Sequence, residues 1–475
     1  MERMTGLDAA FLSMESEGHP MHTLKLLVLE PLPGARPRPL SASLEAGLRE
    51  RLHLLPVLRR RALEVPHGLH HPLWIEERDP DLAPHLHSLV LPAPGGAAEL
   101  DALIAQIAAV PLDRARPLWE MWALEGLEGG ASAVLVKIHH ALADGLTVAQ
   151  LLRRVMTAEP SDAVPGSSDE NDRGPSLRDA SDAPPRDPPD RVELVRGALF
   201  DHRRQLDTLL PLLRLTGERL RALRRHRRAS TARAPLPLRD TPRTSFNRAL
   251  GSARSFASTT LPLSALAAIK HARGVTLNDV FLALVAGSLR EYLVARGELP
   301  PRPLIASVPT AAEHPPTVHG GNHVSSLFVS LQTHLEDPLE RLAAISRSAE
   351  AAKGSQRAIG SDLMERWAAF VPPRVLGGAI AAYCRLGLAD HVPAPLNLIA
   401  SSVPGPGAPL YVPGHRLRAI YSVGPLLEGI GLNVTAWSYL GALHVAVLAD
   451  RDAMPAPRRL TEGMHRALEA LATAT

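Results

Sequence analysis

Residues 131–145 read ASAVLVKIHHALADG, an apolar run that ends in two adjacent histidines and, four residues later, an Asp-Gly pair. The run predicts a buried β-strand, because it is short, aliphatic and rich in valine. Side chains alternate between the two faces of a strand, so Val134, Val136, Ile138 and His140 are expected on one face and His139 on the other. We therefore expect the two histidines to have different roles.

The residues after the histidines predict the change from strand to helix. Asp144 and Gly145 are followed by apolar residues at helical spacing, which places the pair in a turn at the end of the strand. An imidazole fixed at such a point can act as a general base toward a hydroxyl group. Each histidine taken alone also fits a hydrogen-bonded core residue, and Asp144 fits a helix N-cap. The four fixed positions of His-His-x-x-x-Asp-Gly make the catalytic interpretation the more specific one.

The composition indicates a globular protein with two or three domains. The chain has 475 residues, of which 45% are hydrophobic and 21% charged. Its sole cysteine, Cys384, excludes an internal disulfide and a zinc site built from several cysteines. The N-terminus shows no pattern of a secretory signal. These features lead us to expect a cytoplasmic protein without nucleic-acid partners.

Three segments are expected along the chain. Residues 1–158 alternate strand-like and helix-like pieces, which predicts a mixed α/β domain. Residues 159–243 begin as a linker rich in proline, serine and aspartate and continue as an arginine-rich helical segment. That segment fits two interpretations: a helix on an anionic membrane surface, or a solvated helix covering the domain junction. Residues 244–475 predict a second α/β domain.

Other catalytic motifs are missing from the sequence. It contains no Gly-x-Ser-x-Gly elbow, no His-Glu-x-x-His and no Gly-x-x-x-x-Gly-Lys loop. The groups His67, His70, His71 and His85, His87 match no familiar metal-site spacing, so no metal site is expected there.

The histidine motif resembles the signature of the CoA-dependent acyltransferase superfamily, and further segments resemble the bacterial wax ester synthase/diacylglycerol acyltransferase family. These segments are LDAAFLSMESEGHPMHTLKLLVLE (7–30), PLDRARPLWEMWALEGL (111–127), TLNDVFLALVAGSLREYL (276–293), GNHVSSLFVSLQ (321–332) and SSVPGPGAPLYVPGHRL (401–417). The resemblance covers nearly the whole chain apart from the linker. It implies an α/β fold: two chloramphenicol acetyltransferase-like domains with mixed sheets flanked by helices and an active-site tunnel between them.

The resemblance also implies an activity and site residues. The expected reaction moves a long-chain acyl group from acyl-CoA, a substrate and not a cofactor, to diacylglycerol or a long-chain alcohol. His140 would be the general base, and His139, Asp144 and Gly145 would organise the site, with an arginine as the partner of Asp144. The expected location is cytoplasmic, with peripheral contact to the inner membrane or lipid inclusions.

The family motifs Pro117-Leu118-Trp119 and Asn278-Asp279 are expected to bind substrate, although both also fit structural roles. Trp119 fits a core aromatic residue, and Asn278-Asp279 fits a helix-start cap. The sequence departs from the family pattern at Ala311-Ala312-Glu313, where an arginine is common, and at Ser402, where an asparagine is common.

Two other functions remain open at this point. One is a condensation or polyketide-associated acyltransferase supplied by a carrier protein, against which the sequence offers Trp119 and the absence of a carrier domain. The other is a lipid-surface binding protein with little turnover, against which it offers the intact His140.

Overall fold

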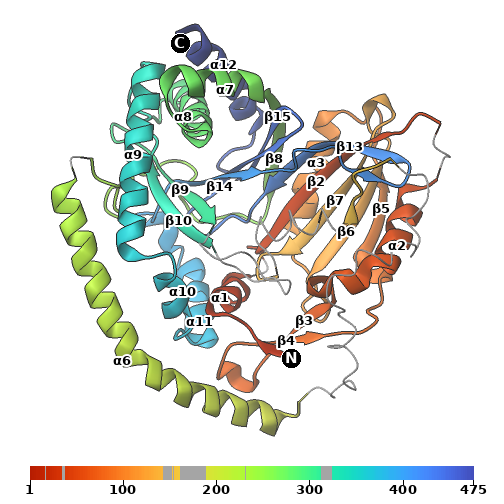
Figure 1. The fold of residues 1–475 in the computed structure, drawn as a ribbon, viewed down its shortest axis with the longest axis vertical. Coiled ribbons are helices and arrows are strands. Elements are labelled where there is room, and N and C mark those ends of the chain that lie inside the picture. Colours follow the sequence, from red (N-terminus) through yellow and green to blue (C-terminus); the bar gives the residue numbers. More distant parts are fainter. Residues whose placement is uncertain are drawn as a thin grey trace.

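Two six-stranded mixed sheets form the centre of the protein (Figure 1). The computed structural model describes residues 1–475 except 17, 35–37, 143–151, 153–154, 161–188, 231, 312–323 and 475. The mixed α/β fold predicted from the sequence is confirmed.

The first sheet has the strand order β12-β13-β2-β7-β6-β5. Neighbouring strands are antiparallel except for the parallel pair β5 and β6. The strands are β2 (His22–Pro31), β5 (Leu86–Val90), β6 (Trp119–Glu125), β7 (Ser132–His139), β12 (Tyr411–Val412) and β13 (His415–Val423). Two strands from the C-terminal part of the chain therefore complete a sheet made by the N-terminal part.

The predicted alternation along 131–140 is confirmed, and it separates two apolar cores. Val134 and Ile138 of β7 pack in one core with residues of α2 (Leu40–Arg51). Leu135 packs on the opposite face, in a core with residues of α3 (Ala97–Ala109). Because both faces of β7 are covered, seven of its eight residues are buried, as expected for a central strand.

Short elements lie next to the first sheet. A three-stranded sheet has the order β1-β4-β3, with β1 (Glu2–Arg3), β3 (Arg60–Leu63) and β4 (Leu73–Glu76). Helix α1 (Gly6–Met14) packs on α10 (Leu363–Ala368) and α11 (Pro373–Arg385). A Cβ atom at Gly6 would collide with the backbone of Ala368, so this close approach requires glycine.

The second sheet has the order β10-β9-β11-β14-β15-β8. Its parallel pairs are β9 with β11 and β11 with β14, and the other pairs are antiparallel. The strands are β8 (Arg254–Pro262), β9 (Ile305–Ala311), β10 (Val324–Ser330), β11 (Leu398–Pro404), β14 (Leu432–Tyr439) and β15 (Ala442–Asp450). Helices α7 (Leu263–Arg273), α8 (Leu277–Ala295), α9 (Pro338–Ile359) and α12 (Arg458–Ala474) pack with it around one large core.

No single helix among the described residues is long and apolar enough to span a membrane. The pair α7 and α8 reaches that length and composition only in combination, across a bend of 107°.

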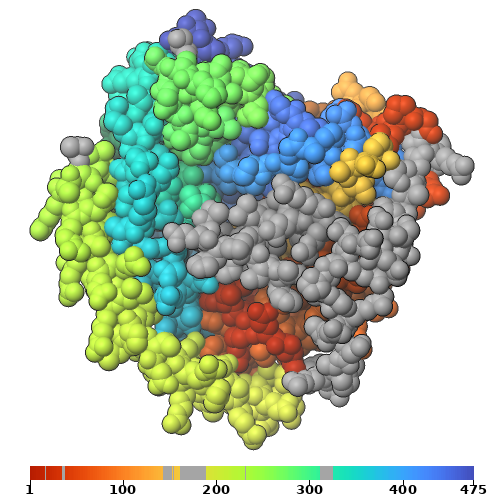
Figure 2. Space-filling view, in the orientation of Figure 1, coloured from red at the N-terminus to blue at the C-terminus, as the bar shows by residue number. Residues whose placement is uncertain are grey.

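A long helix, α6 (Arg191–Ala229), runs along the outside of the molecule and forms its rim in the space-filling view (Figures 1 and 2). It contacts the first half of the chain through an ion pair between Arg3 and Asp201 of 2.6 Å. It contacts the second half through α9 and through a hydrogen bond from the Trp367 indole to Thr216 of 3.0 Å. Residues Arg191–Ala229 of the arginine-rich segment thus form a helix that contacts both halves of the chain.

Candidate active site

The two histidines stand at the point where β7 ends. His139 is the last residue of the strand, and His140 begins the following turn. His139 is fully buried, whereas His140 is half-buried. The main chain at both residues is fixed, because the His139 amide donates to the Leu118 carbonyl (2.9 Å) and the His140 amide donates to the Met21 carbonyl (2.8 Å).

The His139 ring is fully engaged within the protein. Its Nδ1 accepts a hydrogen bond from the Ala141 amide at 3.0 Å. A backbone amide can only donate, so Nδ1 carries the lone pair and the ring proton lies on Nε2. Nε2 faces the Glu15 carboxylate at 3.5 Å. A ring with this surrounding has no route to a substrate.

The Glu15 carboxylate is an unpredicted member of the site. It lies just after α1, its side chain is 4% exposed, and it pairs with Arg114 at 3.0 Å. Burial by itself would raise the pKa of this carboxyl, but His139, Arg114 and the Met21 amide lower it to about 2. Glu15 is therefore a permanent negative charge that orients His139 and connects it to the segment before β2.

His140 has a different environment. Its ring stacks on Phe11 of α1, with ring centroids 4.2 Å apart and an interplanar angle of 12°. Phe11 fixes one face of the imidazole by an apolar contact. The predicted organising partners Asp144 and Gly145 lie outside the described residues.

The residues Pro117, Leu118 and Trp119 lie directly behind the histidine pair and are buried. Besides the bond that the Leu118 carbonyl accepts from the His139 amide, the Trp119 indole donates to the Leu58 carbonyl at 2.7 Å. Its ring stacks on His85 with centroids 4.3 Å apart. These contacts are packing contacts, and a direct substrate contact by this motif stays a prediction.

The Asn278-Asp279 motif begins α8. Asp279 forms a reciprocal capping box with Thr276, with bonds of 2.9 and 3.1 Å, and its carboxylate also accepts from Ser346 at 3.2 Å. Asn278 is half-buried beside it. These bonds show that Asp279 caps the start of α8. A substrate contact by Asn278 or Asp279 stays a prediction.

An apolar pocket lies on the face of β7 that leads toward His140. It lies between the first sheet, α2 and the short strand β12. Its lining includes Leu27 and Leu29 of β2, Leu44, Gly47 and Leu48 of α2, Val134, Val136 and Ile138 of β7, and Tyr411 of β12. Such a lining suits a hydrocarbon chain.

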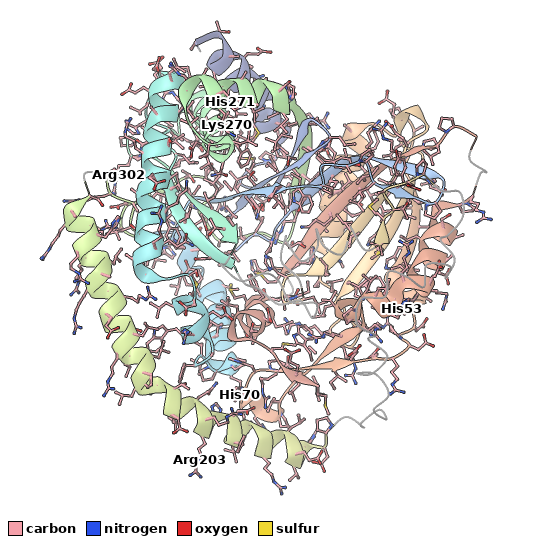
Figure 3. All side chains as sticks on the ribbon, in the orientation of Figure 1. His53, His70, Arg203, Lys270, His271 and Arg302 are labelled. Carbon is pink, nitrogen blue, oxygen red and sulfur yellow. The ribbon has the colours of Figure 1, made fainter. Side chains whose placement is uncertain are left out.

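The histidine groups that raised the question of a metal are engaged otherwise. His85 and His87 stack on Trp119 and Trp122, the latter pair with centroids 4.1 Å apart. The His70 ring packs at a tilt of 38° against His202 of α6, with centroids 4.5 Å apart, and Figure 3 shows it on the inner side of that helix.

Sequence patterns missed Phe11, Glu15 and Arg114. These residues reach the histidine pair from more than 20 positions away, and no local spacing relates them to it. The segments containing them, 7–30 and 111–127, were identified only as stretches of family resemblance.

Comparison with solved structures defines the class of fold. The chain is similar to a wax ester synthase/diacylglycerol acyltransferase from Marinobacter aquaeolei VT8, with a TM-score of 0.67, 24% identity and 99% of both chains covered. It is also similar to a starter condensation domain of rhizomide synthetase, with a TM-score of 0.55, 14% identity and coverage of 99% and 94%. The predicted fold class, shared by acyltransferases and condensation domains, is confirmed.

The family follows from the sequence comparisons. The wax ester synthase/diacylglycerol acyltransferase catalytic domain matches residues 4–281, and the C-terminal domain of that family matches residues 320–472. The chain is 37% identical over 464 residues to a putative diacylglycerol O-acyltransferase of Mycobacterium tuberculosis, covering 98% of this chain and 94% of the relative. A second relative from that organism, with the same name, is 36% identical over 485 residues, covering 100% and 98%. The chain belongs to the wax ester synthase/diacylglycerol acyltransferase family, and the predicted enzyme class is confirmed.

Proposed function

We propose that this protein transfers a long-chain acyl group from acyl-CoA to diacylglycerol or a long-chain alcohol, with His140 as the general base. The observation that carries the proposal is the contrast between the two histidines. His139 is fully buried, with Nδ1 accepting from the Ala141 amide and Nε2 3.5 Å from the Glu15 carboxylate, whereas His140 is half-buried at the end of a strand face that continues into an apolar pocket.

The reaction requires one proton carrier. The His140 imidazole takes the proton of the acceptor hydroxyl, and the resulting alkoxide attacks the thioester carbonyl of acyl-CoA. The tetrahedral intermediate collapses with cleavage of the carbon–sulfur bond, and the CoA thiolate receives the proton from the imidazolium. The ester leaves, and His140 is neutral again.

We assign the apolar pocket to a hydrocarbon chain of one of the two substrates. Val134, Val136 and Ile138 lie on the same face of the strand as His140, so a chain in the pocket has its functional end directed along β7 toward the imidazole. Burial of a methylene group contributes roughly 0.8 kcal/mol, which is a sufficient source of binding energy for a long chain. A tunnel that joins this pocket to a CoA site between the two halves is part of the proposal.

The experiment compares wild type, His140→Ala and His53→Ala, an exposed histidine in the 3-10 turn that follows α2. Radiolabelled palmitoyl-CoA is offered with hexadecanol or with dioleoylglycerol, and ester formation is measured. We expect a loss of about 10²–10⁴-fold in kcat for His140→Ala and none for the control. Unchanged turnover in His140→Ala, or transfer from a carrier-bound acyl group alone, would contradict the proposal.

We further propose that α6 places the enzyme on an anionic lipid surface. An apolar stripe recurs every seven residues along this helix and is exposed to solvent. The stripe consists of Val192 (65% exposed), Leu199 (62%), Leu206 (67%), Leu213 (49%) and Leu220 (44%). Exposed arginines accompany it, and α6 contains eleven arginines against four carboxylates. Figure 3 shows one of them, Arg203, on the outer side of the helix.

This combination favours a lipid surface as the occupant of the stripe. Buried leucines supply apolar binding energy, and arginines at the rim attract anionic headgroups. A second copy of the helix would bring like charges together, which disfavours self-association. Both acceptors are water-insoluble, so a position at a lipid surface also brings the site to its substrate.

Co-sedimentation with vesicles of phosphatidylglycerol and phosphatidylcholine tests the surface. The double variant Leu206→Ser/Leu213→Ser is expected to lower binding by at least about tenfold, since each buried leucine contributes about 1.5–3 kcal/mol. The matched control Val90→Ser/Val294→Ser removes two exposed valines elsewhere, 70% and 53% exposed. Equal binding of both variants would exclude the stripe as the contact.

A further inference from the structure

Three side chains from distant segments meet at a place that the proposed reaction does not use. His19 lies in the connection between α1 and β2, Cys384 lies in the last turn of α11, and Glu428 lies in the connection between β13 and β14. The ligand atoms of all three lie within 4.8 Å of one another. His19 Nε2 and Glu428 Oε2 are 3.0 Å apart.

The His19 ring is oriented for binding through Nε2. Its Nδ1 lies 2.7 Å from the Ser16 hydroxyl, and the backbone amides of Ser16 and His19 each donate to the carbonyl of the other residue. Metal-binding histidines are usually oriented in this way, with the second ring nitrogen hydrogen-bonded to a neighbouring group. Nε2 is buried and, among the described residues, makes no hydrogen bond of acceptable geometry.

Glu428 is largely enclosed. Its side chain is 9% exposed, and besides the contact with His19 its carboxylate accepts a long hydrogen bond of 3.4 Å from the Leu250 amide. The charge of Arg254 also interacts with this carboxylate. A cation between Glu428 and His19 would contact both the carboxylate oxygen and Nε2.

We propose that His19, Cys384 and Glu428 bind a divalent transition-metal cation, with Zn²⁺ as the best match. Imidazole, thiolate and carboxylate are the usual zinc donors, and three protein donors leave a fourth position of the tetrahedron for water. The thiolate makes the set unsuitable for Mg²⁺ or Ca²⁺, which prefer oxygen alone. The thiolate and the carboxylate together carry the two negative charges that the cation neutralises.

Burial, and then the charge of Glu428, raise the pKa of Cys384. Coordination of the sulfur as a thiolate therefore has to displace the thiol proton.

The site connects parts of the fold that support His140. The His19 turn lies between Glu15, which contacts His139, and Met21, whose carbonyl accepts from the His140 amide. Cys384 and Glu428 belong to the second half of the chain. The cation therefore stabilises the contact between the first and second halves of the chain and takes no part in the reaction.

Cobalt provides the test, because a thiolate bound to Co²⁺ produces a charge-transfer absorption band. The sequence contains one cysteine, so any such band reports Cys384. Tag-free full-length protein is titrated with Co²⁺ and then with competing Zn²⁺. We expect the band in wild type, its loss in Cys384→Ser, and at least tenfold weaker binding in His19→Gln and Glu428→Gln. The controls His53→Gln and Glu336→Gln, the latter 93% exposed, are expected to behave as wild type.

Two results overturn the proposal. One is the absence of a band in wild type, and the other is a band of equal affinity in His19→Gln and Glu428→Gln, which means binding by the cysteine alone. Circular dichroism establishes that each variant is folded. If a variant does not fold, the rate of Cys384 alkylation in wild type decides instead, since bound Zn²⁺ is expected to slow it at least tenfold and an unchanged rate contradicts the site.

Discussion

At the scale of single residues, the local sequence accounts for how the two histidines differ, and long-range contacts account for how each is fixed. Strand alternation predicts that His139 and His140 point to opposite faces, and their contacts differ: His139 faces Glu15, whereas His140 stacks on Phe11. Glu15, which fixes His139, is 124 positions away and carries no local pattern. Three predictions test the residues around this pair.

Glu15 makes the folded state sensitive to acid. Its pKa is lowered from 4.5 to about 2 on folding, so its stabilising contribution is complete above pH 4.5 and is lost as the pH falls toward 2. We expect Glu15→Gln to lower the free energy of unfolding at pH 7 by on the order of 3 kcal/mol, and by much less near pH 3. Denaturant unfolding at both pH values measures this, with the exposed Glu45→Gln as control. A difference between wild type and Glu15→Gln that is the same at both pH values would refute this account.

A Trp119→Phe variant distinguishes a packing role of Trp119 from a direct contact with substrate. Replacement by phenylalanine removes the indole donor to the buried Leu58 carbonyl, which is expected to cost about 1–3 kcal/mol in the free energy of unfolding. Because Trp119 is 0% exposed, KM for palmitoyl-CoA is expected to stay unchanged. A raised KM at unchanged stability would show instead that the motif touches substrate.

Phe11 tests the placement of the His140 ring. Phe11→Ala removes the stacked face of the imidazole, while the His140 main chain stays bonded to Met21. We expect kcat to fall about tenfold with KM nearly unchanged, because the base is present but less well oriented. Phe11→Tyr, which keeps the ring, is expected to restore most of the rate. Equal losses in both variants would mean that the stack is not the reason for the effect.

At the scale of elements, amphipathic periodicity predicts where helices and strands form, but not which exposed face a helix keeps. The arginine density of residues 214–228 indicates a basic helix in the sequence. The exposed apolar stripe on α6 can be identified only when the structure shows that Leu194, Ala198 and Leu212 form the buried side of the helix. The pocket under α2 likewise depends on how far that helix stands from the first sheet.

Gly47 tests the pocket at the scale of α2. It lines the pocket, and a Cβ atom there would meet no other atom within 4 Å. Gly47→Leu therefore fills the pocket without a backbone collision and favours the helix. We expect a several-fold shift in kcat/KM toward shorter acyl or alcohol chains, measured with substrates of increasing length. Gly378→Leu, an exposed helical glycine with equally open surroundings, is the control, and an unchanged preference in Gly47→Leu would place the chain elsewhere.

At the scale of the whole molecule, the order of segments along the chain differs from the order of strands in the sheets. The division into 1–158, 159–243 and 244–475 stays a prediction. Strands β12 and β13 of the last segment pair beside β2 of the first, and Lys25 of β2 donates to Ser422 of β13 at 2.6 Å inside the protein. The two halves are therefore parts of one structure.

Expressing the two halves of the chain separately tests whether the first sheet needs strands β12 and β13. Residues 1–160 alone leave β2 as an uncovered, apolar edge strand, so we expect this fragment to aggregate or to lack a cooperative unfolding transition. Co-expression with residues 189–475 is expected to give a soluble complex by size-exclusion chromatography. A soluble 1–160 fragment that unfolds cooperatively would show that the missing strands are dispensable.

The sequence by itself determined the α/β class, the buried strand at 131–139, the opposite orientation of the two histidines and, through its motifs, the family. These depend on periodicity and on residues close to each other along the chain. The tertiary structure alone decided the contacts of Glu15 with His139, of Phe11 with His140 and of β13 with β2. Such contacts join residues about 120 to 400 positions apart. They depend on packing that no local pattern encodes.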